Sequence, residues 1–235
     1  MNIPENALVI FAPVFRPGQA KPRLSPIFTP EEACEIQAAF LGDIAERAAR
    51  AAPAGTAVSV AWSEPPVAAS SPIGTLPPGV AVEIQQGKDP GERMALAIQT
   101  KLRAGHRRAV ILRAGAPTLP ADHIASAFEA LRRAEVVVGP LSSGGCYLVG
   151  MSRLHLEIFL RVDWGAADVL KIARRRIKES GAPFAEIGPW HDVETPEDLG
   201  RLWKDLLHMR EKRTGDLPQR TWHLLARLAP GRIPK

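Results

Sequence analysis

The amino-acid sequence predicts one α/β domain, a three-layer α/β/α sandwich in which helices cover both faces of a mostly parallel sheet. Short apolar segments alternate along the chain with amphipathic segments of helical periodicity, which is the pattern of strands joined by crossover helices. A length of 235 residues suits a single domain of this class. The hydrophobic fraction of 46% is large enough to fill its core.

The expected strands are runs of apolar or β-branched residues bounded by turn-forming residues. In chain order they cover residues 7–12, 56–62, 80–84, 108–112, 135–139, 146–151 and 184–187. The first (ALVIFA) and the fourth (RAVIL) are continuously apolar, which predicts strands buried within a parallel sheet. The second (TAVSVAW) alternates in polarity and is also typical of a strand.

The expected helices cover residues 30–52, 91–103, 120–133, 166–180, 196–209 and 219–228. Two of them begin with the same signal, because Thr29 and Thr195 are each followed by a proline and two acids. In this pattern threonine is the N-cap, proline is the first helical residue, and the acids favour the positive end of the helix dipole. The Pro/Ser/Gly-rich residues 63–79 are expected to be a surface loop.

The positive charge of the chain is concentrated near its C-terminus. The net charge is +5, and residues 201–235 carry nine Lys or Arg against three Asp or Glu, so the rest is close to neutral. This distribution does not favour a nucleic-acid partner. Two cysteines make no disulfide framework, and the sequence shows neither a signal-peptide pattern nor a long apolar run. We therefore expect a cytoplasmic protein.

Four loops are expected to meet at the carboxyl ends of the strands, where sheets of this kind bind ligands. They cover residues 13–24, 85–91, 113–120 and 141–145. The first loop contains a Pro17-Gly18 turn together with Arg16, Lys21 and Arg23. The exposed N–H groups of such a turn and three positive side chains can hold a pyrophosphate. The alternative interpretation is an ordinary solvated basic loop.

Several stretches carry a resemblance when they are taken in order. They are FAPVFRPGQAKPRL (11–24), QQGKDPGERMALAI (85–98), AVILRAGAPTLP (109–120), GPLSSGGCYLVGM (139–151) and WHDVETPEDL (190–199). The series resembles a bacterial family of nucleotide-diphospho-sugar transferases with the glycosyltransferase-A fold, some members of which are assigned to arsenosugar biosynthesis. It is also similar to small nucleotidyltransferases that act on molybdenum cofactor or phospholactate. The resemblance covers about Leu8 to Trp203 and implies a nucleotide or nucleotide-sugar as partner.

The resemblance implies a set of residues that contact the nucleotide or its phosphates. They are Arg16, Gly18, Lys21, Arg23, Gln86, Arg93, Arg113, Gly115, Ser143, Gly144 and Gly145. Some of these positions have a second interpretation. Arg93 would either touch the nucleotide or order its own loop through an ion pair, and the acids Asp89 and Glu92 equally suit a helix start. Gly144 and Gly145 would admit a sugar or phosphate, or simply form a hairpin turn.

Several acidic positions of the family are neutral in this chain. Gly115 stands where the family has the aspartate that holds a divalent metal, and Thr118 and Ser143 replace further acids. Because Mg²⁺ and Mn²⁺ need carboxylate oxygens, either metal would lack its expected ligand here. Asp192 and Glu194 remain, and the resemblance implies that they act as a base or hold the acceptor; Asp192 is also the one candidate metal ligand.

Three functions follow from this pattern. One is metal-independent glycosyl transfer from a nucleotide-sugar, with Arg113, Arg16 and Lys21 supplying positive charge. The second is a nucleotide-binding or partner-binding protein with little activity, and the third is a nucleotidyltransferase, whose chemistry relies more heavily on metal carboxylates.

The chain is expected to divide into a nucleotide-sugar-binding domain, residues 1–213, and a basic tail, residues 214–235. The tail contains a short amphipathic helix that is expected to dock on the domain through its apolar face. The alternatives are a homodimer contact and an anionic membrane surface.

Overall fold

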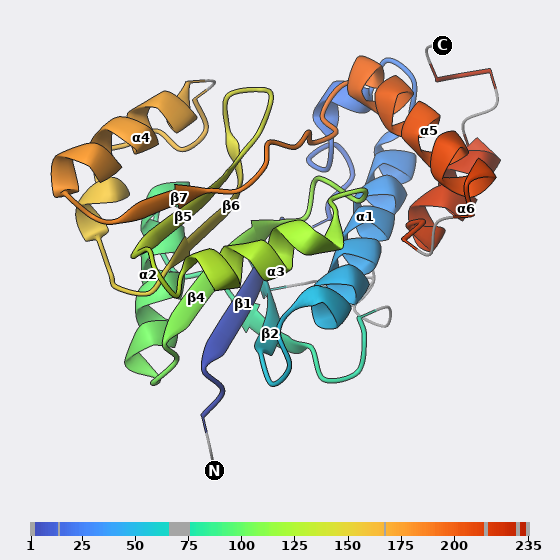
Figure 1. Ribbon diagram of the computed structural model, residues 1–235. Coiled ribbons are helices and arrows are strands. Elements are labelled where there is room, and N and C mark those ends of the chain that lie inside the picture. Colours follow the sequence, from blue (N-terminus) through green and yellow to red (C-terminus); the bar gives the residue numbers. More distant parts are fainter. Residues whose placement is uncertain are drawn as a thin grey trace.

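The computed structural model describes residues 3–13, 15–65, 76–166, 168–213, 216–228 and 231–233. They form a seven-stranded sheet with helices on both faces, so the predicted three-layer α/β fold is confirmed (Figure 1). Most of the predicted loop 63–79 lies outside the described residues. Among the described helices, none is both long and apolar enough to cross a membrane.

Every predicted strand is present within two residues of its expected bounds. The strands are β1 Asn6–Ala12, β2 Ala57–Trp62, β3 Ala81–Ile84, β4 Arg108–Arg113, β5 Val136–Pro140, β6 Cys146–Met151 and β7 Phe184–Glu186. Their order in the sheet is β3-β2-β1-β4-β6-β5-β7. All neighbouring pairs are parallel except those of β6, which runs antiparallel to both β4 and β5. The connection from β5 to β6 is too short for the crossover that a parallel pair needs, so the two strands form a hairpin.

The helices follow the predicted order as well. They are α1 Pro30–Ala51, α2 Pro90–Arg103, α3 Ala121–Ala130, α4 Val169–Ser180, α5 Pro196–Glu211 and α6 Gln219–Leu228. Both predicted N-caps are confirmed: Thr29 accepts from the backbone N–H of Glu32, and Thr195 accepts from that of Asp198, each within a capping box. Helix α3 ends at Ala130 rather than at residue 133, because the next residues form a turn.

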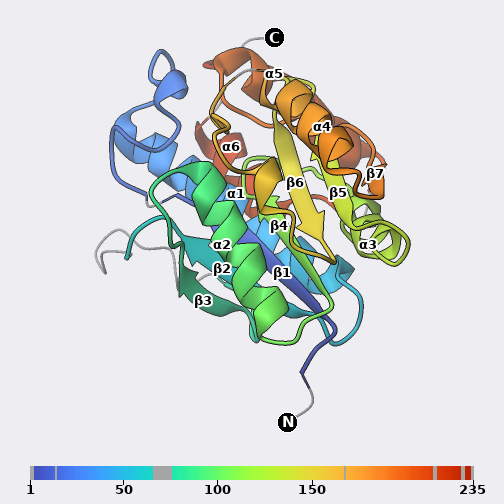
Figure 2. The same ribbon diagram turned by 90° about the vertical axis from the view of Figure 1, so that its left-hand side faces the viewer.

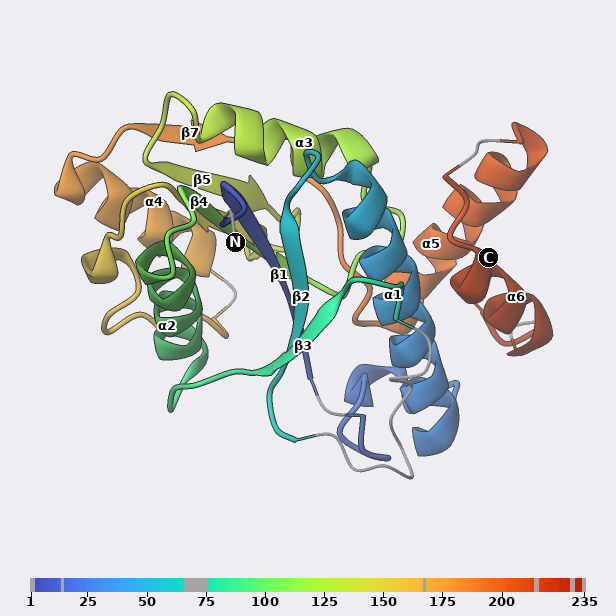
Figure 3. The ribbon, with the colours of Figure 1, turned by 90° about the horizontal axis from the view of Figure 1, so that it is seen from below.

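Two apolar cores fill the space between the three layers. On one face of the sheet, Ile44 of α1 and Phe128 of α3 pack against Leu8, Val110 and their neighbours. On the other face, Ile98 of α2 and residues of α4 pack against Val9 and Ile111. Seen from below, α2 and α4 lie on one side of the sheet and α1 and α3 on the other (Figure 3). Figure 2 shows α2 and α4 in front of the strands.

A third core joins the C-terminal helices to the outer side of α1. Phe40 of α1, Leu202 of α5 and Leu225 of α6 are among its buried members, and the rings of Trp203 and Trp222 stack with centroids 5.2 Å apart. The amphipathic helix predicted in the tail therefore packs on the protein itself through its apolar face.

The first turn of α6 is held by a buried carboxylate of α1. Asp43, which is 5% exposed, accepts hydrogen bonds from the backbone N–H groups of Arg220 (3.1 Å) and Thr221 (2.7 Å). Next to it, Gly42 leaves room for the Arg220 side chain, since a methyl carbon there would lie 2.3 Å from a guanidinium nitrogen. These contacts satisfy two N–H groups that a helix start leaves without intrahelical partners.

Candidate functional site

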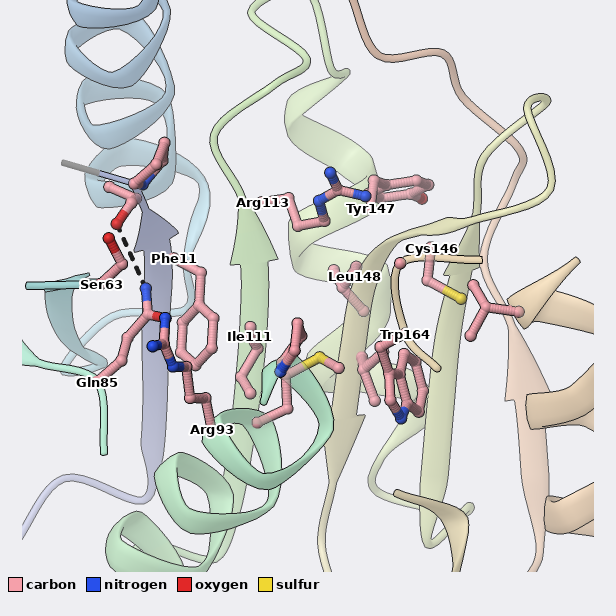
Figure 4. Close-up of a pocket in the computed structure, with 17 residues that line it drawn as sticks. Phe11, Ser63, Gln85, Arg93, Ile111, Arg113, Cys146, Tyr147, Leu148 and Trp164 are labelled. Carbon is pink, nitrogen blue, oxygen red and sulfur yellow. Dashed lines mark hydrogen bonds between the residues drawn. The ribbon is translucent and has the colours of Figure 1, made fainter. Parts of the chain in front are cut away.

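A pocket of about 370 Å³ opens near the carboxyl ends of β1 and β4, on the face of the sheet covered by α2 and α4 (Figure 4). Its apolar walls include Phe11, Ile111 and Trp164, and Arg113 lies at the end of β4 where the pocket opens. This is the edge of the sheet at which the sequence predicts ligand binding. A mostly apolar cavity with a few polar groups at one end is the usual form of a small-molecule site.

Gln85 and Arg93 supply the fixed polar groups of the pocket. The Nε2 group of Gln85 donates to the carbonyl oxygens of Ala61 (2.7 Å) and Ala12 (3.3 Å), so Gln85 ties the ends of β1 and β2 together. The Nε of Arg93 donates to the carbonyl of Gly87 (3.1 Å). Arg93 therefore orders its own loop through a hydrogen bond while it lines the pocket.

Gln86, the neighbour that the resemblance indicated, is exposed, and its Nε2 lies 3.4 Å from the carbonyl of Ile84. Gln85 was missed because the family motif emphasises Gln-Gly, whereas the side chain of Gln85 is the one that faces the pocket. The acids of the same motif have structural roles. Asp89 caps α2 by accepting from Glu92 N (2.9 Å), and the Glu92 carboxylate accepts from Lys88 N (2.8 Å).

Arg113 is the exposed cation at the mouth of the pocket. Among the described residues its guanidinium has no hydrogen-bond or ion-pair partner. It also reaches the β5–β6 hairpin, because its Nη1 would lie 3.8 Å from a methyl carbon built at Gly145. A guanidinium has five N–H donors in a planar fork that suits phosphate oxygens. Arg113 can therefore hold an anionic group at this end of the pocket.

Trp164 forms a wall of the pocket that the sequence did not predict. Its ring lies so close to the start of α2 that a methyl carbon at Gly91 would be 2.7 Å from its Cδ1. The ring also packs on Phe159, with centroids 5.3 Å apart. The available signal was a tryptophan in the segment RVDWGAAD, ahead of α4, whose other side chains are small or charged apart from one valine. Gly91 is required here for close packing rather than for a turn.

A second cluster lies at the same edge of the sheet, around Gly115. A methyl carbon at Gly115 would lie 3.5 Å from Cβ of Asp192, 3.7 Å from Nζ of Lys21 and 3.9 Å from Oε1 of Glu194. The Nζ of Lys21 donates to the carbonyl of Val193 (2.6 Å) and to Oε1 of Glu194 (2.7 Å). The structure thus brings together four residues that the resemblance assigned to the site.

The β5–β6 hairpin borders this cluster. Its turn is closed by a hydrogen bond from Leu141 N to the carbonyl of Gly145 (2.8 Å), and Gly144 has a positive φ of 95° that suits glycine. The Oγ of Ser143 lies 3.4 Å from Oδ1 of Asp192. Gly144 and Gly145 form the hairpin turn that the sequence left as one of two interpretations.

The remaining basic residues of the first loop are more peripheral. Arg16 forms an ion pair with Glu64 (2.7 Å), which follows β2, and both side chains are about half exposed. Arg23 is exposed, and Gly18 occupies a turn with φ of 83°. Lys21 is therefore the basic residue of this loop that the structure buries in the cluster.

Behind the hairpin, a buried hydrogen-bond network supports β6. The hydroxyl of Tyr147 donates to the carbonyl of Gly188 (2.9 Å) and lies 2.9 Å from Nδ1 of His123. Burial raises the pKa of Tyr147 and lowers that of His123, so the neutral forms of both side chains are favoured. Tyr147 also lies at an irregularity in the pairing of β5 with β6, a feature common next to sites.

The cluster around Gly115 does not fit a divalent cation. Its carboxylates are Asp192 and Glu194, and Glu194 already binds the ammonium group of Lys21. Gly115 offers no side-chain ligand, and hard divalent cations take several oxygen ligands. Within the described parts of the chain, no group of three or more His, Cys, Asp or Glu side chains is arranged to hold a metal.

The chain has the fold seen in a solved nucleotide-diphospho-sugar transferase structure, which is the fold that the sequence resemblance implied. Residues 44–166, more than half of the chain, match the bacterial family described as an uncharacterized protein conserved in bacteria (DUF2064), and the chain belongs to this family. No curated protein matches the chain significantly in sequence.

Solved structures with this fold include transferases of two kinds. A proposed nucleotide-diphospho-sugar transferase from Desulfovibrio desulfuricans G20 is 24% identical with a TM-score of 0.81, over 95% of this chain and 98% of its own. CMP:2-keto-3-deoxy-manno-octonic acid synthetase in complex with CTP is 12% identical with a TM-score of 0.55, over 86% and 99% of the two chains. 4-Diphosphocytidyl-2C-methyl-D-erythritol synthase is 13% identical with a TM-score of 0.54, over 84% and 96%.

Proposed function

We propose that this protein binds a nucleotide-diphospho-sugar in the pocket and transfers its sugar, as a divergent glycosyltransferase of the glycosyltransferase-A type. The observation that carries the proposal is a largely apolar pocket of about 370 Å³ with an unpaired arginine, Arg113, at its mouth. The apolar walls suit a nucleobase and ribose, and the guanidinium suits the diphosphate. The fold shared with a synthetase solved with CTP supports a nucleotide ligand.

In this proposal the two parts of the site have different roles. The nucleoside lies in the pocket, and Arg113 neutralises the diphosphate that leaves as the C1–O bond of the sugar breaks. Asp192, at the neighbouring cluster, accepts the proton of the acceptor hydroxyl as its oxygen forms the new bond to C1. Glu194 forms an ion pair with Lys21, so in this proposal it holds Lys21 in place and does not act as the base.

Isothermal titration with UDP-, GDP-, CDP- and ADP-sugars in EDTA tests the binding step. We expect one of these donors to bind in the micromolar range and Arg113→Met to weaken it by about 10- to 100-fold, because a hydrogen bond to a charged group contributes about 1.5–3 kcal/mol. Arg103→Met is the matched control, since Arg103 is an exposed arginine at the opposite end of α2. Failure of every nucleotide and nucleotide-sugar to bind would refute the proposal.

A second candidate is a nucleotide-binding protein with little transfer activity. The observation that favours it is the ion pair of Glu194 with Lys21, which leaves Asp192, hydrogen-bonded to Ser143, as the carboxylate of the cluster that could act as a base. The two candidates differ in turnover: a transferase releases nucleoside diphosphate from its donor, and Asp192→Asn abolishes that release while donor binding persists. A donor that binds but is never consumed with any acceptor supports the second candidate. Release of pyrophosphate from a nucleoside triphosphate would instead indicate a nucleotidyltransferase.

A further inference from the structure

The absence of a side chain at Gly115 leaves a notch in the site, and three functional groups face it. The position of the missing Cβ is 3.5 Å from Cβ of Asp192, 3.7 Å from Nζ of Lys21 and 3.9 Å from Oε1 of Glu194. These distances are ordinary van der Waals contacts, so a methyl group at position 115 would touch all three groups without displacing them. The three groups come from two distant segments of the chain, with Lys21 and Glu194 separated by 173 residues.

The ammonium group of Lys21 lies beside Gly115 and is held there by two hydrogen bonds. The Lys21 side chain is 3% exposed, and its two hydrogen bonds go to adjacent residues, the carbonyl of Val193 and the carboxylate of Glu194. Its backbone has φ of 44° and ψ of 52°, a left-handed conformation that is uncommon for lysine. A residue held in such a conformation at a site is a signal of function.

Two of the three N–H donors of this ammonium group therefore have hydrogen-bond partners among the described residues, and the third has none there, although Nζ also lies 5.9 Å from the centre of the Phe40 ring. The segment that accepts the bonds is fixed in turn, because Val193 N donates to the carbonyl of Gly115 (3.1 Å). Lys21, Gly115 and Val193 thus form one connected unit at the edge of the sheet.

Electrostatics at the notch oppose a divalent cation. A cation that approached both Asp192 and Glu194 would meet the ammonium group of Lys21, which lies 2.7 Å from Oε1 of Glu194. Such a cation could bind only by displacing Lys21 from a buried ion pair, which would leave a buried charge without its partner. The same positive charge, already in place, can neutralise an anionic ligand.

We propose that the ammonium group of Lys21 takes the place of a divalent cation in this site, so that the protein binds its diphosphate ligand without a metal. This rests on the proposed function for the identity of the ligand. Lys21, together with Arg113 at the pocket mouth, supplies the positive charge, and Gly115 presents no side chain that would stand between Lys21 Nζ and a phosphate oxygen.

The first test uses Mn²⁺ alone and is independent of any nucleotide. Electron paramagnetic resonance measures Mn²⁺ bound by the wild type, by Gly115→Asp and by the double variant Lys21→Met/Gly115→Asp. We expect no site in the wild type or in Gly115→Asp, where the new carboxylate pairs with Lys21. The double variant, in which three carboxylates converge, should bind one Mn²⁺ at least tenfold more tightly. Equal Mn²⁺ binding by the wild type and the double variant, whether tight or absent, would overturn the proposal.

The second test measures nucleoside diphosphate binding in EDTA and in MnCl2. The wild-type affinity should change by less than twofold between the two buffers, Lys21→Met should lose at least tenfold in both, and Mn²⁺ should restore affinity to the double variant. Thermal melting checks that each variant is folded, and Gly115→Asp without the lysine change serves as a folded reference. A wild type that binds the nucleotide only with Mn²⁺ overturns this inference and leaves the proposed function standing. A wild type that binds no nucleotide in either buffer overturns the proposed function, while the Mn²⁺ titration still decides on Lys21.

Discussion

The hydrogen bonds between Asp43 and the start of α6 allow us to predict how much stability the protein loses when Asp43 is replaced. Asp43→Ala removes the acceptor of two backbone N–H groups, at 3.1 and 2.7 Å, and leaves both without a partner in a buried place. Hydrogen bonds to a charged group contribute about 1.5–3 kcal/mol each. Burial of the carboxylate offsets part of this, since it raises the pKa of Asp43 above its ordinary value. We therefore expect a loss of about 2–4 kcal/mol in the free energy of unfolding.

Urea unfolding followed by circular dichroism and tryptophan fluorescence measures this loss. Fluorescence includes a contribution from α6, because Trp222, one of five tryptophans in the chain, stacks on Trp203. For a chain of this size the melting temperature should fall by about 5–12 °C. Asp43→Asn keeps one acceptor oxygen and should lie between wild type and alanine, and Arg50→Ala, an exposed change on the same helix, should have little effect. A loss below about 0.5 kcal/mol for Asp43→Ala, within the range of surface changes, would refute this reasoning.

Three further variants or measurements test other parts of the structure. Arg232, donating to Glu32, is the main cause that lowers the pKa of Glu32 to about 2, so the stability this carboxylate contributes is present above pH 4.5 and lost as the pH falls toward 2. The difference in the free energy of unfolding between Glu32→Gln and wild type should therefore be largest near neutral pH and should vanish near pH 2. A difference that does not change with pH would contradict this. Gly91→Ala places a methyl carbon 2.7 Å from Trp164, so we expect the free energy of unfolding to fall by about 1–3 kcal/mol. Unchanged fluorescence and an unchanged melting temperature would argue against this close contact. Burial raises the pKa of Cys146 to about 12, so iodoacetamide at pH 8 should alkylate it at least about a hundredfold more slowly in folded than in unfolded protein, as mass spectrometry would show.

The fold could be predicted because its signals are local. Apolar runs, helix N-caps and the short β5–β6 connection each lie within a few residues, and Thr29 and Thr195 marked their helix starts correctly. The antiparallel direction of β6 follows from that short connection. The mostly parallel sheet that the sequence predicted is therefore present, with one reversed strand next to the site.

The candidate site was only partly predictable, because its contacts join distant segments. The resemblance assigned both Lys21 and Glu194 to the site, but their ion pair spans 173 residues and no local pattern indicates it. The sequence also gave Arg16 the same role as Lys21, whereas Arg16 pairs with Glu64, since parallel strands β1 and β2 end side by side. Trp164 was missed because its position depends on how the segment before α4 returns over α2.

The ion pair between Lys21 and Glu194 also has a consequence for how the protein is made. Lys21 emerges from the ribosome long before Val193 and Glu194. Its ammonium group therefore lacks these two hydrogen-bond acceptors until the later segment has emerged. Contacts between segments so far apart in sequence close late in folding. A nascent chain that already contains the walls of the pocket therefore lacks the completed cluster at its mouth. The cluster can therefore hold an anionic ligand only after Val193 and Glu194 have emerged from the ribosome.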